Sequence, residues 1–183
     1  MKNDFSNHIL VSMPHLADPI FARSIVLVCN HSDDGAMGII INKPIESEES
    51  GLILEETELN IIRPKPVIYY GGPVSVDSGI VIHNNKYIID ESINLSDKLS
   101  ITSSEKIIDD MKKGSGPDTY KIALGYSGWA SGQLENEIMN GDWIPISADS
   151  DFIFQIPDNQ KWSIAASQIG IDINNAGGNP GIA

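Results

Sequence analysis

Cys29 and His31 are the residues whose types and spacing most directly suggest covalent chemistry. They are two positions apart on a predicted strand, so both side chains are expected on the same face of a sheet. An imidazole beside a thiol lowers the thiol pKa and produces a reactive thiolate. With His83 or Asp33 added, the pair would offer ligands to a transition metal. We favour an inert, buried cysteine, and expect no metal and no cofactor, because buried cysteines usually act as small apolar residues.

Ser127 is a second candidate nucleophile. It lies in Gly125-Tyr126-Ser127-Gly128, between a predicted strand and a predicted helix, as in the G-x-S-x-G nucleophile elbow. The fifth position is Trp129 instead of glycine, and every histidine precedes the serine, whereas the usual base follows it. The glycines are therefore expected to let the strand turn sharply and the helix pack closely. With Ser131 and Gly132, the segment could alternatively bind an anion through amides at a helix N-terminus.

A groove for a ligand or partner is predicted near the same glycines. Lys43 precedes Pro44, which keeps its backbone extended, and it would project as an isolated cation from an acidic chain. Trp129 is the tryptophan expected to line a pocket, because it lies closest to the glycine turns. The groove would be formed by Gly125–Leu134 and the adjacent strand end, Met37–Pro44. Its predicted residues are Lys43, Gly125, Tyr126, Ser127, Gly128, Trp129 and Gly132.

The elements that must position these residues alternate between strands and helices. Short runs rich in Val and Ile predict strands at 25–28, 38–42, 67–70, 79–82, 86–89, 121–124 and 152–154. Helices are predicted from a capping box at 102–105 to Gly114, at 133–140, at 158–169 and, more weakly, at 52–59. The pattern predicts one mixed α/β domain over residues 1–183, with a mobile tail at 174–183.

Composition excludes several classes of partner. The chain has 183 residues, of which 41% are apolar, and 12 Lys and Arg against 25 Asp and Glu give a net charge of −13. Nucleic-acid affinity depends on Lys and Arg, so this charge argues against a direct nucleic-acid partner and against an anionic membrane surface. The single cysteine excludes an internal disulfide. An acidic start and the lack of an apolar run of about 20 residues predict a cytoplasmic protein without a signal peptide or membrane helix.

Several strings stand out together in order and spacing. They are Ser12-Met13-Pro14, Asp18-Pro19-Ile20-Phe21-Ala22-Arg23-Ser24, Cys29-Asn30-His31, Gly35-Ala36-Met37-Gly38-Ile39-Ile40-Ile41-Asn42-Lys43-Pro44, Gly71-Gly72-Pro73-Val74, Ala123-Leu124-Gly125-Tyr126-Ser127-Gly128-Trp129, Gly132-Gln133-Leu134-Glu135 and Trp143. The combination resembles the AlgH/YqgE family over about residues 10–171. The resemblance implies an α/β domain with a strongly bent, partly closed mixed sheet and helices packed outside. It also implies a small cytosolic bacterial protein of a group often labelled as transcriptional regulators, and it carries no catalytic residue with it.

Three functions remain open on the sequence. The leading hypothesis is a non-catalytic cytosolic binding or regulatory protein that contacts a protein or a small ligand. The first alternative is an enzyme that uses Cys29 with His31, or Ser127 with a base elsewhere. The second is a DNA-binding regulator, which would need Arg63, Lys65, Lys112 and Lys113 to gather on one face and is disfavoured by the net charge of −13.

Overall fold

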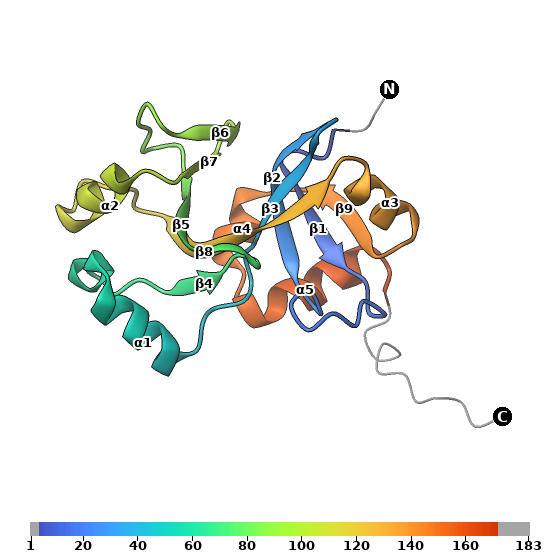
Figure 1. The fold of residues 1–183 in the computed structure, drawn as a ribbon, viewed down its shortest axis with the longest axis horizontal. Helices are drawn as coiled ribbons and strands as arrows, with labels where there is room; N and C mark the ends of the chain where they lie inside the picture. The colour runs from blue at the N-terminus through green and yellow to red at the C-terminus, as the bar shows by residue number, and fades with distance from the viewer. Residues whose placement is uncertain (1–3, 172–183) are drawn as a thin grey trace.

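The computed structural model describes residues 4–171, and one curved sheet runs through this part of the chain (Figure 1). The nine strands lie in the order β6-β7-β5-β8-β3-β2-β1-β9, with β4 beside β8. The strands are β1 (His8–Ser12), β2 (Ile25–Ser32), β3 (Gly35–Ile40), β4 (Ile68–Tyr70), β5 (Val74–Asn84), β6 (Ile93–Ser96), β7 (Leu99–Thr102), β8 (Tyr120–Ala130) and β9 (Trp143–Ser147). The pairs are antiparallel except for β4 with β8, so the sheet is mixed, as predicted.

Five α-helices and one short 3₁₀ helix within residues 4–171 cover the sheet. They are α1 (Ser47–Glu56), η1 (Glu58–Ile61), α2 (Glu105–Lys112), α3 (Gln133–Met139), α4 (Ser150–Gln155) and α5 (Asp158–Gln168). The predicted α/β class, with a bent sheet and helices outside, is confirmed (Figure 1). No helix in the described range is long and apolar enough to cross a membrane.

Continuous apolar strands form because both faces of the sheet are covered. Along β1, Ile9 and Val11 pack in the cluster that includes Trp162 of α5. Leu10, between them, packs in another cluster with Leu134 of α3. A third cluster joins α1 and α2 to β4, β5 and β8, and its members include Leu54, Ile68, Val81, Ile107 and Ile122.

Gly125 divides β8 into two halves with different neighbours. Before it, β8 pairs with β4 and with the end of β5; after it, Tyr126 still pairs with Val74 of β5, and Ser127 to Ala130 pair with β3. Gly71 lies between β8 and β3 at the point where the neighbours of β8 change. Its N–H donates to the carbonyl of Leu124 at 2.8 Å, and its carbonyl accepts from the N–H of Ile40 at 2.9 Å. The sheet therefore bends at a place where one strand exchanges partners.

This exchange requires glycines. Gly125 has φ +71°, a left-handed conformation that disfavours side chains. A Cβ on Gly125 would lie 2.4 Å from the Gly72 carbonyl oxygen, and a Cβ on Gly71 would lie 2.2 Å from that of Gly125. Gly125 was predicted to let the strand turn before a helix. Instead, Gly125, Gly71 and Gly72 allow the backbone of β8 and the backbone after β4 to lie in direct contact.

The structure corrects several predicted elements. Residues 86–89 form a turn and a loop instead of a strand, and 152–154 belong to α4. The predicted capping box is displaced, because Ser104 caps α2 by accepting a hydrogen bond from the Lys106 N–H. Thr102 is the last residue of β7. The predicted tail at 174–183 lies outside the described residues.

We predict that Gly125→Ala destabilises the protein far more than Gly132→Ala. Gly132 has nearly the same φ, +72°, but open space around its Cβ position. Gly132→Ala should therefore cost only the backbone strain, about 1–2 kcal/mol, whereas Gly125→Ala adds overlap with backbone and should cost about 3 kcal/mol or more. Urea denaturation measures both, and equal losses would contradict the close-contact role of Gly125.

Candidate functional site

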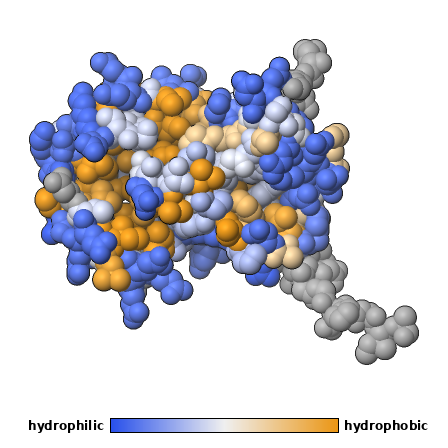
Figure 2. All heavy atoms as spheres, in the orientation of Figure 1, coloured by the Kyte–Doolittle hydropathy of each residue, from blue (hydrophilic) through white to orange (hydrophobic). Residues whose placement is uncertain are grey.

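A hollow of about 860 Å³ lies between β5 and β8 on one side and α2 with η1 on the other. We call it the β5–α2 groove. Its apolar lining is Met37, Leu59, Ile80, Val81, Ile107, Ile108, Ile122, Leu124 and Tyr126. Figure 2 shows hydrophobic surface gathered in the half of the molecule that carries α1 and α2, with hydrophilic residues around the outline. The volume is in the range of ordinary ligand sites.

Strand geometry aims these residues at the groove. Alternate residues of a strand face the same side, so Ile122 and Leu124 of β8 line the hollow together. Tyr126 also lines it, although it follows the left-handed Gly125 and packs in the cluster that includes Ile80. On β5 the pairing with β8 shifts register between Val74 and Gly79, so the residues between them bulge out of the sheet. This bulge brings Ser75, Asp77 and Ser78 to the edge of the groove.

The rim of the groove is acidic. It contains three acidic residues, Asp77, Glu105 and Asp109, and a single basic residue, Lys112. The Lys112 ammonium lies 2.8 Å from Asp109, and its hydrogen bond and charge lower the pKa of that carboxyl. Asp77 and Glu105 make no ion pair among residues 4–171. The rim therefore carries net negative charge above an apolar floor.

Only part of the predicted groove lines this hollow. Tyr126 and Met37 do so, but the predicted residues after Tyr126 continue along β8 instead of forming a turn. Trp129, which was predicted to line a pocket, does not line this hollow; it is 7% exposed, and its Nε1–H donates to Glu137 at 2.8 Å. Trp143 donates to the same carboxylate oxygen at 2.9 Å, so Glu137 fixes both indoles beneath α3.

The remaining predicted groove residues lie elsewhere. Gly132 is the N-terminal cap of α3, and Gly128 pairs with Met37 of β3. Lys43 is not an isolated projecting cation: its ammonium donates to the backbone carbonyls of Pro19 and Ile20. Burial lowers the pKa of Lys43, against the opposing effect of Asp18. Lys43 therefore stabilises the loop before β2 through these hydrogen bonds and is not a freely projecting cation.

The expected pairing of Cys29 with His31 is wrong. A register shift between Val28 and Asn30 interrupts β2, so the two side chains leave the strand on opposite faces. Cys29 packs in the cluster beneath α5, and burial raises the pKa of its thiol to about 12. His31 instead lies against Phe5 on the other face, with its Nε2 3.4 Å from Glu135.

Ser127 and His83 are likewise placed away from the partners that catalysis or metal binding would need. Ser127 is buried within β8, and its Oγ has no hydrogen-bond partner in the described part of the chain. His83 is fully buried, with its Nε2 2.8 Å from the Thr102 hydroxyl, and burial lowers its pKa. No group of three metal-ligating side chains occurs among the described residues.

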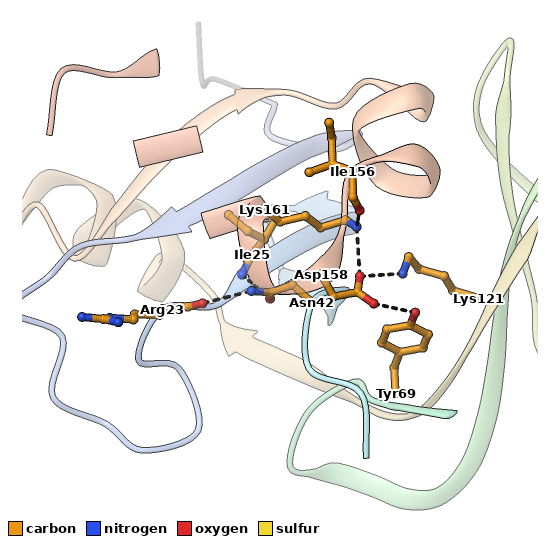
Figure 3. Close-up of polar contacts among 8 residues, drawn as sticks. All are labelled: Arg23, Ile25, Asn42, Tyr69, Lys121, Ile156, Asp158 and Lys161. Atoms are coloured by element: carbon orange, nitrogen blue, oxygen red, sulfur yellow. Dashed lines mark hydrogen bonds and ion pairs between the residues drawn. The ribbon is translucent and has the colours of Figure 1, made fainter. Parts of the chain in front are cut away.

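A buried ionic cluster that was not predicted lies on the other face of β8. Lys121 of β8 and Lys161 of α5 both place their ammonium groups 2.9 Å from Oδ1 of Asp158, and the Tyr69 hydroxyl donates to Oδ2 at 2.8 Å (Figure 3). Lys161 also donates to the carbonyl of Ile156. One carboxylate therefore joins α5 to β4 and β8, and we call these four side chains the Asp158 cluster.

The sequence holds a signal for this cluster. Lys121 begins the apolar run Lys121-Ile122-Ala123-Leu124, and Lys161 lies four residues before Ala165 on the buried side of α5. A charge at such a position must be paired inside the protein. The sequence predicts Asp158 as the N-terminal cap of this helix, but the residue before it, Pro157, occupies the cap position.

Burial and the contacts within the cluster shift the pKa values of Asp158 and Lys121. Burial raises the pKa of Asp158, but hydrogen bonds from Lys121, Lys161 and Tyr69 outweigh this effect and hold the pKa below its usual value. Burial lowers the pKa of Lys121, with Asp158 opposing the shift and the Lys161 charge adding to it.

We predict that Cys29 reacts with a thiol reagent only when the protein unfolds, because its thiolate is disfavoured by burial. The control is Met139→Cys in a Cys29→Ser background, since Met139 is 76% exposed. This control should be labelled at once under native conditions. Labelling of native Cys29 at a comparable rate would contradict the buried assignment.

We predict that Asp158→Asn lowers the free energy of unfolding at pH 7 by about 3 kcal/mol, because two buried ammonium groups lose their counter-charge. Because the pKa of Asp158 is lower in the folded state than the unfolded value of 3.8, its carboxylate stabilises the folded protein at pH values above 3.8. This contribution to the free energy of unfolding is lost as the pH falls through the folded-state pKa. The wild type should therefore lose its advantage over Asp158→Asn below about pH 4. Urea denaturation at pH 7 and pH 3 measures this. Asp97→Asn, in an exposed turn, should change stability by less than about 0.5 kcal/mol.

Known proteins are similar to this chain in sequence and in fold. A family model described as AlgH-like matches residues 9–174. A UPF0301 protein of Photobacterium profundum is 39% identical over 178 residues, covering 94% of this chain and 95% of that protein. A UPF0301 protein of Hahella chejuensis is 43% identical over 166 residues, covering 91% and 89%.

Two solved structures have the same fold. The AlgH protein from Pseudomonas aeruginosa superposes with a TM-score of 0.74 at 30% identity, covering 100% of this chain and 98% of that one. A protein from Corynebacterium diphtheriae gives 0.69 at 22% identity, covering 88% and 85%, and supports the fold alone. The family match extends over most of the chain and agrees with the relatives and with the fold, so the chain belongs to the AlgH-like family.

Proposed function

We propose that this protein is a non-catalytic binding protein whose β5–α2 groove takes an apolar segment of a cationic partner protein. The observation that carries the proposal is the pairing of an apolar floor with an acidic rim in a hollow of about 860 Å³. An amphipathic helix with basic flanks would place its apolar face against Ile108, Leu124 and Tyr126, which line the hollow and are partly exposed. Its cations would then lie near Asp77 and Glu105.

Charge favours a protein partner over a nucleic acid. The net charge of −13 repels a polyanion and steers cationic partners toward the surface. The cations that a DNA-binding regulator would need are already engaged in part: Arg63 donates to the carbonyls of Asn60 and Ile62, and Lys112 pairs with Asp109. A regulatory role would therefore operate through contact with another protein, in the cytoplasm.

We predict that a synthetic amphipathic peptide, with leucines on one helical face and lysines on the other, binds the groove. Exchanging its lysines for glutamates should abolish binding, because the rim is acidic. The double variant Asp77→Lys with Glu105→Lys should weaken binding by about tenfold or more, through charge repulsion at the rim. Fluorescence anisotropy with labelled peptide, at two salt concentrations, measures the affinity and its salt dependence.

Matched controls separate the groove from the overall charge. Asp97→Lys with Asp151→Lys makes the same charge change at exposed sites outside the groove and should leave most of the affinity. Ile108→Asp, in the groove, should reduce binding more than Leu52→Asp, which alters an apolar residue that is 61% exposed elsewhere. If the two double variants lose affinity equally, peptide binding is only electrostatic attraction and the groove is not the site.

A further inference from the structure

The Asp158 cluster carries more positive than negative charge. Lys121 and Lys161 contribute two cations, and their side chains are only 7% and 1% exposed, whereas Asp158 contributes one anion. Burial and the adjacent Asp158 raise the pKa of Tyr69, so its hydroxyl stays neutral and supplies no second negative charge. No other carboxylate in the described part of the chain pairs with either ammonium. The Lys121 ammonium also lies 3.9 Å from the centre of the Tyr69 ring, a contact that stabilises the cation but supplies no negative charge. One buried positive charge is therefore without a counter-ion.

A second hollow lies beside this excess charge. It measures about 330 Å³ and is lined by Tyr69 and Lys121 of the cluster. Figure 3 shows Lys121 and Tyr69 on one side of Asp158, with Lys161 on the other. The remaining lining residues are Pro64, Lys65, Pro66, Val67, Asp118, Thr119, Tyr120 and Phe154.

The balance of charge around the hollow favours an anion. Lys65 at the rim makes no ion pair among the described residues. Asp118, the only lining acid in this part of the chain, is already engaged: Lys86 lies 3.2 Å from it, and the Asn84 amide donates to it at 2.6 Å. The hollow is therefore bordered by two cations, Lys121 and Lys65, and by one neutralised carboxylate.

We propose that this hollow is a binding site for a small organic monoanion, with a carboxylate group toward Lys121 and an aromatic or apolar body against Tyr69, Tyr120 and Phe154. A buried charge is stable when it is paired, and a monocarboxylate supplies the one missing negative charge. The aromatic and proline residues supply apolar contact, and the volume suits a ligand of about ten heavy atoms.

This site is independent of the β5–α2 groove. Lys121 and Ala123 of β8 face α5, whereas the alternate residues Ile122 and Leu124 line the groove. Variants of one face therefore test one site and leave the other intact.

The test is a titration of the full-length protein with benzoate, followed by amide chemical shifts and by thermal unfolding. Benzamide is the neutral control of the same shape, and sodium chloride at equal ionic strength is the control for small inorganic anions. Benzoate is expected to shift amides around Tyr69 and Lys121 and to raise the melting temperature. Binding should weaken as pH rises, because the anion binds the ammonium form of Lys121, whose pKa burial lowers.

Variants locate the binding. Lys121→Met leaves the Asp158–Lys161 pair in place and should weaken benzoate binding at least tenfold, while Lys98→Met, at an exposed turn, should not change it. Lys65→Met changes only an exposed rim residue, so it tests the site without disturbing the fold, and should weaken binding roughly threefold. Equal shifts with benzamide or chloride, or full affinity in both Lys121→Met and Lys65→Met, would overturn the proposal.

Discussion

The arrangement of the sheet follows from one close contact, that of Gly71 and Gly72 with β8 at Gly125. Backbone passes backbone there with no room for a Cβ, and Gly125 adopts a left-handed conformation. Because of this contact β8 can exchange β4 and β5 for β3 as its neighbours, and the sheet bends where it does so. The bulge of β5 between Val74 and Gly79 lies at the same place and forms part of the groove.

The alternation of side chains along β8 then assigns a different environment to each face. Ile122 and Leu124 lie toward α2 and line an open apolar groove. Lys121 lies toward α5, where its charge is held by Asp158 beside a smaller hollow. One strand therefore presents an apolar surface suited to a protein segment on one side and a buried cation suited to a small anion on the other.

Charges at the groove rim and charges in the Asp158 cluster interact with different strength, because the rim is exposed to solvent and the cluster is buried. The groove rim is exposed, so its negative charge attracts partners over a distance but is screened by salt. The Asp158 cluster is buried, where charges interact more strongly and each unpaired charge is costly. An acidic exterior and an interior with an excess cation are compatible because solvent screens the first and protein encloses the second.

Local patterns and composition are enough to predict the fold class, the family resemblance, most of the strands and helices, and the acidic surface. It also marked Tyr126 and Met37 near a groove. That Cys29 and His31 face opposite sides is visible only in the folded chain, because no sequence signal distinguishes the bulge in β2 from regular strand. In the same way, Lys121, Asp158 and Lys161 meet only because α5 folds back onto β8, and no local pattern specifies which distant carboxylate will neutralise a buried lysine.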